Sequence, residues 1–414
     1  MLDRPEPAEH LPLPVTFDDI EDARRLIRPW VYESPCAFSQ SLSNLTRTRC
    51  YLKLENLQMT GSYKERGALN RLARLTPEEA RRGVIAFSAG NHAQGVAYHA
   101  QRLGIDATIV MPLYTPLVKV TSTRRYGAHV ILFGESAAEA RAESFRIAAA
   151  EGRTYIHPFD DPWVVAGQGT VGLELLEQNP YLDAVVVPVG GGGLIAGLAL
   201  AMKETNPRIK IYGVESEAMA SMRASLKAGQ LVEVPSRRTL AEGIAVSRVG
   251  DIPFQLCQRY VDDVITVDDE EIASAVLTLL EVEKTVVEGS GAAALAAVVN
   301  GHLPVAGKKV ALVLTGGNID VTMLARIIER GLVKDGRMVR LAARVVDAPG
   351  ALAKLTARIA ELGGNILQIN HERAFARGPL GVSLVEVTLE ARGHEHIKEI
   401  VTGLESVGIN TTLE

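Results

Sequence analysis

A lysine near the start of an expected helix is the first residue in this sequence that could carry chemistry. The short apolar strand Cys50–Leu54 runs into a polar turn, and a helix is expected to begin near Tyr63. Lys64 then lies in the first helical turn, where the positive end of the helix dipole disfavours a cation. The position suits either a solvated lysine or an amine that loses its proton to form a Schiff base. Lys64 alone does not decide between the two.

A second stretch, Ser88-Ala89-Gly90-Asn91-His92, offers hydrogen-bond donors at the start of another expected helix. The free backbone N–H groups of a helix start can hold an anion, and the side chains of Ser88, Asn91 and His92 add donors. A carboxylate is a suitable ligand for such a site. A serine cap followed by an asparagine turn explains the same residues without a ligand.

Four consecutive glycines join an expected strand, Ala184–Val189, to an expected helix, Leu194–Lys203. They are Gly190, Gly191, Gly192 and Gly193. A backbone without side chains can wrap closely around a phosphate at a helix N-terminus. No Gly-Lys-Ser/Thr follows, so this is not a Walker loop.

The same loop admits an alternative from another class of enzyme. The spacing Gly191-x-Gly193-x-x-Ala196, with Glu215 after the next strand, fits a dinucleotide-binding fingerprint. A nicotinamide-dependent dehydrogenase is therefore possible, but it leaves Lys64 and Asn91 without a role.

A fourth stretch, Leu314-Thr315-Gly316-Gly317-Asn318, again follows a strand. The hydroxyl of Thr315 suits a ring nitrogen, although an ordinary strand-to-helix turn explains the residues as well. A lysine amine, a phosphate cradle, a carboxylate loop and a neutral hydroxyl together match one cofactor, pyridoxal phosphate.

Apolar strands alternate with helices from Val84 onward, which predicts an α/β fold with parallel sheets covered on both faces. Ligands of such folds bind beyond the carboxyl ends of the strands, where all four stretches lie. The expected strands are Val84–Ser88, Ala107–Met111, His129–Phe133, Thr154–Ile156, Ala184–Val189, Lys210–Val214, Asp263–Val267 and Lys309–Leu314. The expected helices include Phe17–Val31, Ala93–Leu103, Pro116–Tyr126 and Ser136–Glu151.

The pattern changes after Arg337, where residues 338–414 show the order βαββαβ of a ferredoxin-like domain. Its expected elements are Met338–Val345, Ala351–Leu362, Asn365–Glu372, Leu380–Glu390, Glu395–Val407 and Ile409–Leu413. We expect a catalytic domain over 1–330, with a small subdomain at about 55–150, and a linker over 331–337. Residues 1 to about 15 are expected to form an untethered tail.

The motifs together resemble the threonine dehydratase (threonine ammonia-lyase) family of fold type II, with its tryptophan-synthase-β-like fold. The resemblance runs from about residue 15 to 330 and rests on Gly61-Ser62-Tyr63-Lys64-x-Arg66-Gly67-Ala68, residues 88–95, His157-Pro158-Phe159-Asp160-Asp161, the four glycines and Gly316-Gly317-Asn318. The segment after Arg337, with Asp347-x-Pro349-Gly350, resembles an ACT regulatory domain.

This resemblance implies how the cofactor is held. Lys64 would form the Schiff base and later remove the α-proton. The other implied cofactor contacts are Tyr63 beside the ring, Asn91 at the phenolic oxygen, Gly190 to Leu194 at the phosphate, Gly243 over the cofactor and Thr315 at the pyridine nitrogen. Ser88, Asn91 and His92 would hold the substrate carboxylate.

Three features of this chain qualify the resemblance. The family usually has Phe and Ser where Tyr63 and Thr315 stand, which leaves substrate size open. Related racemases have a serine at the position of Ala89, so racemisation is not expected. Glu215 and Ser221 fall where some relatives bind a cation, but a serine in place of an acid disfavours a divalent site, and no metal is expected.

The expected reaction is elimination of water from L-threonine, and also from L-serine, giving a 2-oxo acid and ammonia. A dehydratase or racemase acting mainly on serine or another 3-hydroxy amino acid is the alternative within this family, and a non-catalytic amino-acid sensor is a third class. By resemblance, isoleucine or valine would act at the ACT-like domain of a homodimer or homotetramer.

The charge, the cysteines and the hydropathy of the sequence indicate which partners and which cellular compartment to expect. The net charge is −5 and no long basic run occurs, which argues against nucleic acid and anionic membranes. The three cysteines have neither metal-ligand nor disulfide spacing. No signal peptide or membrane-spanning run is evident, so a soluble cytoplasmic protein is expected.

Overall fold

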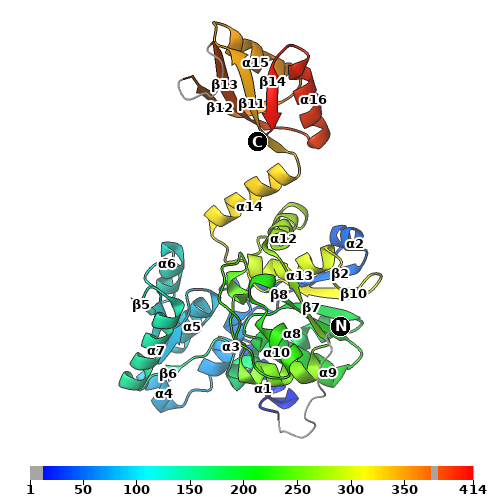
Figure 1. Cartoon of the computed structure of the whole chain (residues 1–414). Helices are drawn as coiled ribbons and strands as arrows, with labels where there is room; N and C mark the ends of the chain where they lie inside the picture. The colour runs from blue at the N-terminus through cyan, green and yellow to red at the C-terminus, as the bar shows by residue number, and fades with distance from the viewer. Residues whose placement is uncertain (1–12, 374–380, 414) are drawn as a thin grey trace. The chain divides into compact units, whose positions relative to one another are not determined.

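The computed structural model describes residues 13–373 and 381–413. The chain divides into two compact units, one ending at Asp320 and one beginning at Val321 (Figure 1). The tail expected at the N-terminus lies largely outside the described residues, as does Leu380, the expected first residue of one strand.

The larger sheet of the first unit has the strand order β1-β2-β10-β7-β8-β9. Every neighbouring pair is parallel except β1 and β2. The strands are β1 Cys36–Ser39, β2 Arg49–Lys53, β7 Ala184–Pro188, β8 Lys210–Ser216, β9 Asp263–Val267 and β10 Lys309–Val313. Buried aliphatic side chains fill the central strands β7 and β10, as parallel sheets require.

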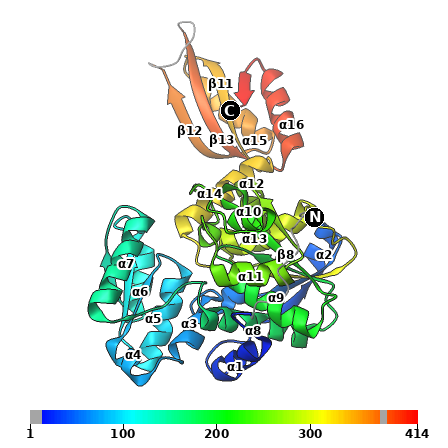
Figure 2. The ribbon, with the colours of Figure 1, turned by 60° about the horizontal axis from the view of Figure 1, so that its bottom comes forward.

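A smaller sheet of wholly parallel strands has the order β5-β4-β3-β6. Its strands are β3 Val84–Phe87, β4 Ala107–Met111, β5 His129–Leu132 and β6 Thr154–Tyr155. With their helices they form the subdomain drawn mainly in cyan in Figures 1 and 2. The sequence predicted these strands to within one residue at each end.

The helices of the first unit surround both sheets. They are α1 Phe17–Ile27, α2 Gln40–Thr46, α3 Lys64–Leu72, α4 Pro77–Arg82, α5 Asn91–Leu103, α6 Leu117–Arg125, α7 Ala137–Glu151, α8 Pro162–Gln178, α9 Gly193–Thr205, α10 Ser221–Ala228, α11 Asp251–Tyr260, α12 Asp269–Val282 and α13 Gly289–Val299, with short 3-10 helices η1 Glu55–Leu57, η2 Glu217–Met219 and η3 Glu242–Ile244. Helix α3 packs against both α5 and α8, and so joins the two sheets.

Most expected boundaries lie within two residues of those in the structure, and two expectations differ by more. Helix α1 ends at Ile27 and not at Val31, because Pro29 has no N–H with which to continue the helical hydrogen bonds. Part of the expected linker is helical, since residues 331–334 belong to α14 Val321–Lys334. Apolar residues recur at helical spacing on both sides of Gly331, which favours a helix that continues through this glycine.

The C-terminal unit has the expected βαββαβ order after α14. Its elements are β11 Met338–Val346, α15 Ala351–Glu361, β12 Asn365–Glu372, β13 Val382–Glu390, α16 His394–Glu405 and β14 Asn410–Leu413. The antiparallel sheet has the order β12-β13-β11-β14, and its buried residues pack with Leu355, Ile359, Ile400 and Leu404 of the two helices. This matches a ferredoxin-like domain.

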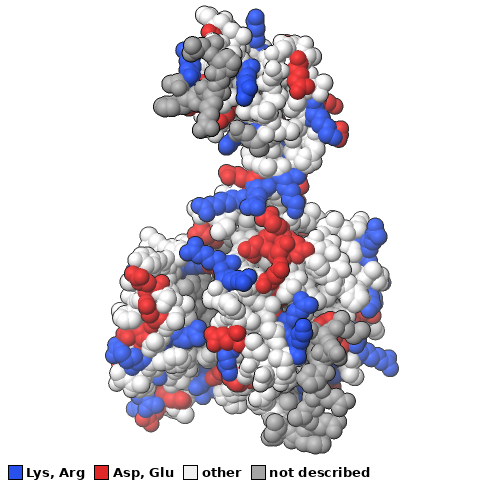
Figure 3. Space-filling model, viewed as in Figure 1, with Lys and Arg blue, Asp and Glu red and all other residues white. Residues whose placement is uncertain are grey.

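The charged side chains follow no simple pattern on the visible surface. Acidic and basic side chains are interspersed on the face shown in Figure 3, and several Asp and Glu side chains gather near the middle of the first unit. An extended basic face, which a nucleic-acid partner requires, is not seen in that view. Within the described parts of the chain, none of the helices combines the length and the apolar character needed to cross a bilayer.

Candidate active site

Lys64 is the first residue of α3, as the sequence predicted, and it is half-buried. Its Nζ atom donates to the carbonyl oxygen of Pro158 at 2.9 Å and lies 5.2 Å from the centre of the Tyr63 ring. Burial lowers the pKa of the Lys64 amine to about 8, while the nearby carboxylate of Glu288 opposes that shift. The amine is therefore much easier to deprotonate than an exposed lysine.

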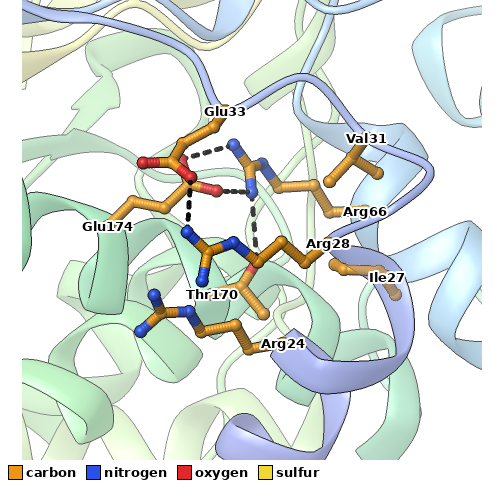
Figure 4. Close-up of a pocket in the computed structure, with 8 residues that line it drawn as sticks. All are labelled: Arg24, Ile27, Arg28, Val31, Glu33, Arg66, Thr170 and Glu174. Atoms are coloured by element: carbon orange, nitrogen blue, oxygen red, sulfur yellow. Dashed lines mark hydrogen bonds and ion pairs between the residues drawn. The ribbon is translucent and has the colours of Figure 1, made fainter.

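A buried group of charges fixes the helix that carries Lys64. The guanidinium of Arg66, two residues further into α3, bonds both Glu55 and Glu174 at distances from 2.5 to 2.8 Å. Figure 4 shows Arg66 reaching Glu174 and Thr170. Lys53 at the end of β2 bonds Glu174 from the other side at 2.5 Å. Breaking one partner of such a buried set costs about 3–5 kcal/mol, so the start of α3 is held rigidly.

Three of the four predicted stretches meet around the side chain of Asn91. Its Nδ2 atom donates to Glu288 at 2.7 Å, and its Oδ1 atom accepts from Asn318 at 2.8 Å. Asn318 also donates to the carbonyl of Thr60 at 2.8 Å. The backbone N–H of Tyr63 bonds the carbonyl of Thr315 at 3.1 Å. The lysine stretch, the asparagine loop and the Gly316-Gly317-Asn318 loop therefore form one site.

The tetraglycine loop joins this site through Phe159. A Cβ atom at Gly191 would lie 2.2 Å from the Phe159 ring, and one at Gly193 would lie 3.0 Å from its carbonyl oxygen. Gly192 has φ +91, which favours glycine. Because α9 begins at Gly193, the N–H groups of its first turn have no carbonyl partner within the helix. A cradle that only glycine can form, beside an amine of lowered pKa, fits pyridoxal phosphate.

The remaining predicted residues lie at the edges of this arrangement. Gly243 is next to the glycine loop, since a Cβ atom at Gly190 would lie 3.1 Å from its carbonyl oxygen. Leu194 and Thr315 are buried. The hydroxyl of Ser88 accepts the N–H of Gly90 at 3.1 Å.

His92 is more enclosed than a substrate-binding side chain needs to be. Its ring is 3% exposed, and Nε2 bonds the carbonyl of Ile156 at 2.8 Å. Burial, together with the nearby charge of Lys64, lowers the pKa of His92 to about 3. The ring is therefore neutral at physiological pH and serves as a donor to the backbone.

Glu215 has a structural partner on each oxygen. Its two oxygens accept the backbone N–H groups of Met222 and Arg223, at 2.7 and 2.9 Å, in the first turn of α10. The hydroxyl of Ser221 donates to the carbonyl of Val246 at 2.7 Å. Glu215 is thus a helix cap and not the free carboxylate that a dinucleotide ribose would need, so it gives the dehydrogenase interpretation no support. Clusters of three or more metal-ligating side chains are absent from the described residues.

Sequence reasoning missed Glu288 and Pro158. Glu288 precedes α13 and is a lone acid between apolar residues and a run of Gly, Ser and Ala, which is a detectable signal. Burial raises its pKa to about 7. Pro158 contributes only a carbonyl oxygen, and no residue type signals that.

Comparison with known proteins accounts for this arrangement. A family described as pyridoxal-phosphate dependent enzyme matches residues 27–316. The chain belongs to this pyridoxal-phosphate-dependent family. Its cofactor is therefore pyridoxal phosphate, and its catalytic unit has the tryptophan-synthase-β-like fold of type II.

Individual members of the family are similar over most of the chain. An L-threonine ammonia-lyase from Thermotoga maritima is 51% identical over 386 residues, which cover 93% of this chain and 96% of that protein. The solved structure of processed threonine deaminase isoform 2 from Solanum lycopersicum has a TM-score of 0.73 and 36% identity, covering 80% of this chain and 91% of that one. Maize serine racemase also has a TM-score of 0.73 and 36% identity, covering 77% and 98%.

Proposed function

We propose that this pyridoxal-phosphate-dependent enzyme converts L-threonine to 2-oxobutanoate and ammonia. The observation that carries the proposal is the half-buried amine of Lys64, with a pKa of about 8, set between the Asn91 network and the glycine cradle. The identity of 51% to an L-threonine ammonia-lyase supports the substrate. In this reaction the α-proton is removed, the β-hydroxyl leaves as water, and the released enamine takes up water to give the 2-oxo acid and ammonia.

The proposal gives each group at the site a task. When bound, pyridoxal phosphate withdraws electrons from the α-carbon and so makes its proton acidic. Lys64 holds the cofactor and, once its amine is free, takes that proton. Asn91, fixed by Glu288 and Asn318, orients the cofactor and, with Ser88, the substrate carboxylate.

The other cofactor contacts follow from the elements around Lys64. Gly190, Gly191, Gly192, Gly193 and Leu194 present the start of α9 to the phosphate. As the resemblance implies, Tyr63 would pack beside the ring, Gly243 would cover it and the Thr315 hydroxyl would face its nitrogen. His92, neutral and bonded to Ile156, offers its backbone N–H to the carboxylate while its ring supports the loop.

The direct test is turnover by the purified holoenzyme. We expect 2-oxobutanoate and ammonia in equal amounts from L-threonine, pyruvate from L-serine at a lower rate, and no D-serine in a chiral assay because Ala89 carries no acid–base group. Lys64→Ala should abolish turnover with unchanged circular dichroism, whereas Lys227→Ala, at an exposed lysine on α10, should keep it. Lasting turnover by Lys64→Ala contradicts the proposal, and D-serine as the main product favours a racemase.

We further propose that residues 338–414 regulate this activity by binding isoleucine or valine, with residues 1–330 as the catalytic domain. Gly350, with φ +88, opens α15, and a Cβ atom there would meet nothing within 4 Å, so the loop leaves room for a carboxylate.

Strand β12 lies at a sheet edge and exposes Leu367 and Ile369, and an unpaired edge favours pairing with a second copy. Such pairing would give a homodimer or homotetramer.

Ending the chain just before Met338, which removes residues 338–414, tests this regulation. The truncated enzyme should retain turnover of L-threonine and lose its response to isoleucine and valine, because an effector acts only through different affinities for two states. If truncated and intact enzymes respond identically, the C-terminal unit is not the regulatory site.

A further inference from the structure

The segment His157–Asp161 contacts the site from several directions. The carbonyl of Pro158 accepts the Lys64 amine at 2.9 Å. The next residue, Phe159, packs so closely that a Cβ atom at Gly191 would overlap its ring, at 2.2 Å, and one at Gly193 would crowd its backbone, at 3.0 Å. This segment therefore links the amine to the phosphate cradle.

Its last two residues anchor the segment to helices. Asp160 accepts the N–H of Ile252 in the first turn of α11 at 2.9 Å. Asp161 caps α8 by accepting the N–H groups of Trp163 and Val164, and it pairs with Arg71 of α3 at 3.1 Å. The end of the segment at Asp160 and Asp161 is therefore fixed. The position of the Pro158 carbonyl then depends on the other end, at His157.

The side chain of His157 holds the start of the segment in place. Its Nδ1 atom accepts the backbone N–H of Asp160 at 2.8 Å and that of Phe159 at 3.4 Å. The ring proton must then reside on Nε2. Burial lowers the pKa of His157 to about 4, so Nδ1 stays free to accept at neutral pH. The ring also packs edge-on against Phe159, with ring centres 4.7 Å apart.

We propose that His157 is a positioning residue for the Lys64 amine, because its Nδ1 atom holds the turn that presents the Pro158 carbonyl to that amine. The carbonyl takes one N–H of the neutral amine and leaves the lone pair to be directed at the substrate α-proton. The inference rests on the proposed role of Lys64 as base. A misplacement of about 1 Å in such a group can lower a rate by about a hundredfold.

Two substitutions separate the hydrogen bond from the packing of the ring. His157→Phe keeps a ring beside Phe159 and removes the acceptor. His157→Asn removes the ring and keeps an oxygen that can accept backbone N–H groups two or three residues on, as in an Asx turn. His129→Ala, at an exposed histidine that opens β5, is the control.

The first measurement compares kcat for L-threonine and for L-threonine deuterated at the α-carbon. We expect His157→Phe to lower kcat about tenfold or more, to raise the deuterium isotope effect and to leave KM within about twofold, while His157→Asn and His129→Ala stay close to wild type. A fall in kcat with an unchanged isotope effect, or His157→Asn performing worse than His157→Phe, would overturn the proposal in favour of a packing role.

The second measurement needs no cofactor and no turnover. In the apoprotein, acetic anhydride should label Lys64 several-fold faster in His157→Phe than in wild type or His157→Asn, with the exposed Lys227 as internal reference. Equal labelling of Lys64 in all three proteins contradicts the proposal. If the wild-type enzyme does not consume L-threonine, the proposed function fails, and this labelling still decides whether His157 positions the amine.

Discussion

At the scale of single residues, burial changes the chemistry of Lys64. A pKa of about 8 leaves about one amine in ten neutral at pH 7, compared with fewer than about one in a thousand for an ordinary lysine. The carboxylate of Glu288 limits the shift, so the amine remains available both as a nucleophile and as a base. The Pro158 carbonyl gives this amine a fixed place.

Gly191 lies against the ring of Phe159 with no room for a side chain between them. A Cβ atom there would lie 2.2 Å from the Phe159 ring, so Gly191→Ala should displace the ring or the loop at a cost of about 1–3 kcal/mol. We expect the Kd for pyridoxal phosphate to rise by about tenfold or more, as measured by fluorescence titration of the apoprotein. Adding Phe159→Ala should recover part of the affinity, and a wild-type Kd for Gly191→Ala alone would show that the loop does not cradle the phosphate.

Glu288 should give stability a specific dependence on pH. Burial raises its pKa to about 7, so the folded state favours the protonated carboxyl. The stability it contributes is complete below its ordinary pKa of about 4.3 and is lost as the pH rises through about 7. Glu288→Gln cannot ionise, and relative to wild type its free energy of unfolding should therefore increase between pH 4.5 and 8.

Urea unfolding of the apoproteins at several pH values checks this expectation. Glu217→Gln, at an exposed position in the same unit, is the matched control. A difference between Glu288→Gln and wild type that stays constant with pH would mean that the carboxyl is not buried as the structure has it.

At the scale of elements, the sequence predicted the strands well because each is a short run of branched apolar residues. Strands β4 and β9 have the expected bounds, and the glycine loop follows β7 as expected. Helix α1 was predicted too long because its apolar pattern continues past Pro29. Strand β1 was not predicted, since Cys36–Ser39 is short and partly exposed.

The site was predictable where a residue type signals its chemistry. Lys64, Asn91 and the four glycines are of this kind, and the structure brings them together. The roles of Pro158 and His157 depend on backbone groups and on contacts between distant segments, which no local pattern encodes. The burial of His92 and the partners of Glu215 likewise arise only when the chain has folded.

Glu215 caps the start of α10 by accepting two backbone N–H groups. Glu215→Ala would leave two buried N–H groups of the first helical turn without an acceptor, which costs about 1–2 kcal/mol. Glu215→Gln keeps one acceptor oxygen and should lose less. Urea denaturation measures both, and an alanine variant as stable as wild type would refute the capping role.

At the scale of the whole molecule, the two compact units have separate cores. We expect two transitions in calorimetry of the apoprotein. Pyridoxal phosphate at about 100 times its Kd should stabilise the larger unit by about 2.7 kcal/mol and raise the temperature of its transition alone. A single transition that shifts as a whole would show that the two units unfold together.

The central claim is that Lys64 holds the cofactor, and borohydride reduction of the holoenzyme tests it most directly. Reduction makes the link between cofactor and amine permanent, and mass spectrometry of the peptides then locates it. We predict the label on Lys64, whose amine is easily deprotonated. Lys53 should remain free, because it is wholly buried and paired with Glu174. A label on Lys53 or on any lysine other than Lys64 would contradict the account.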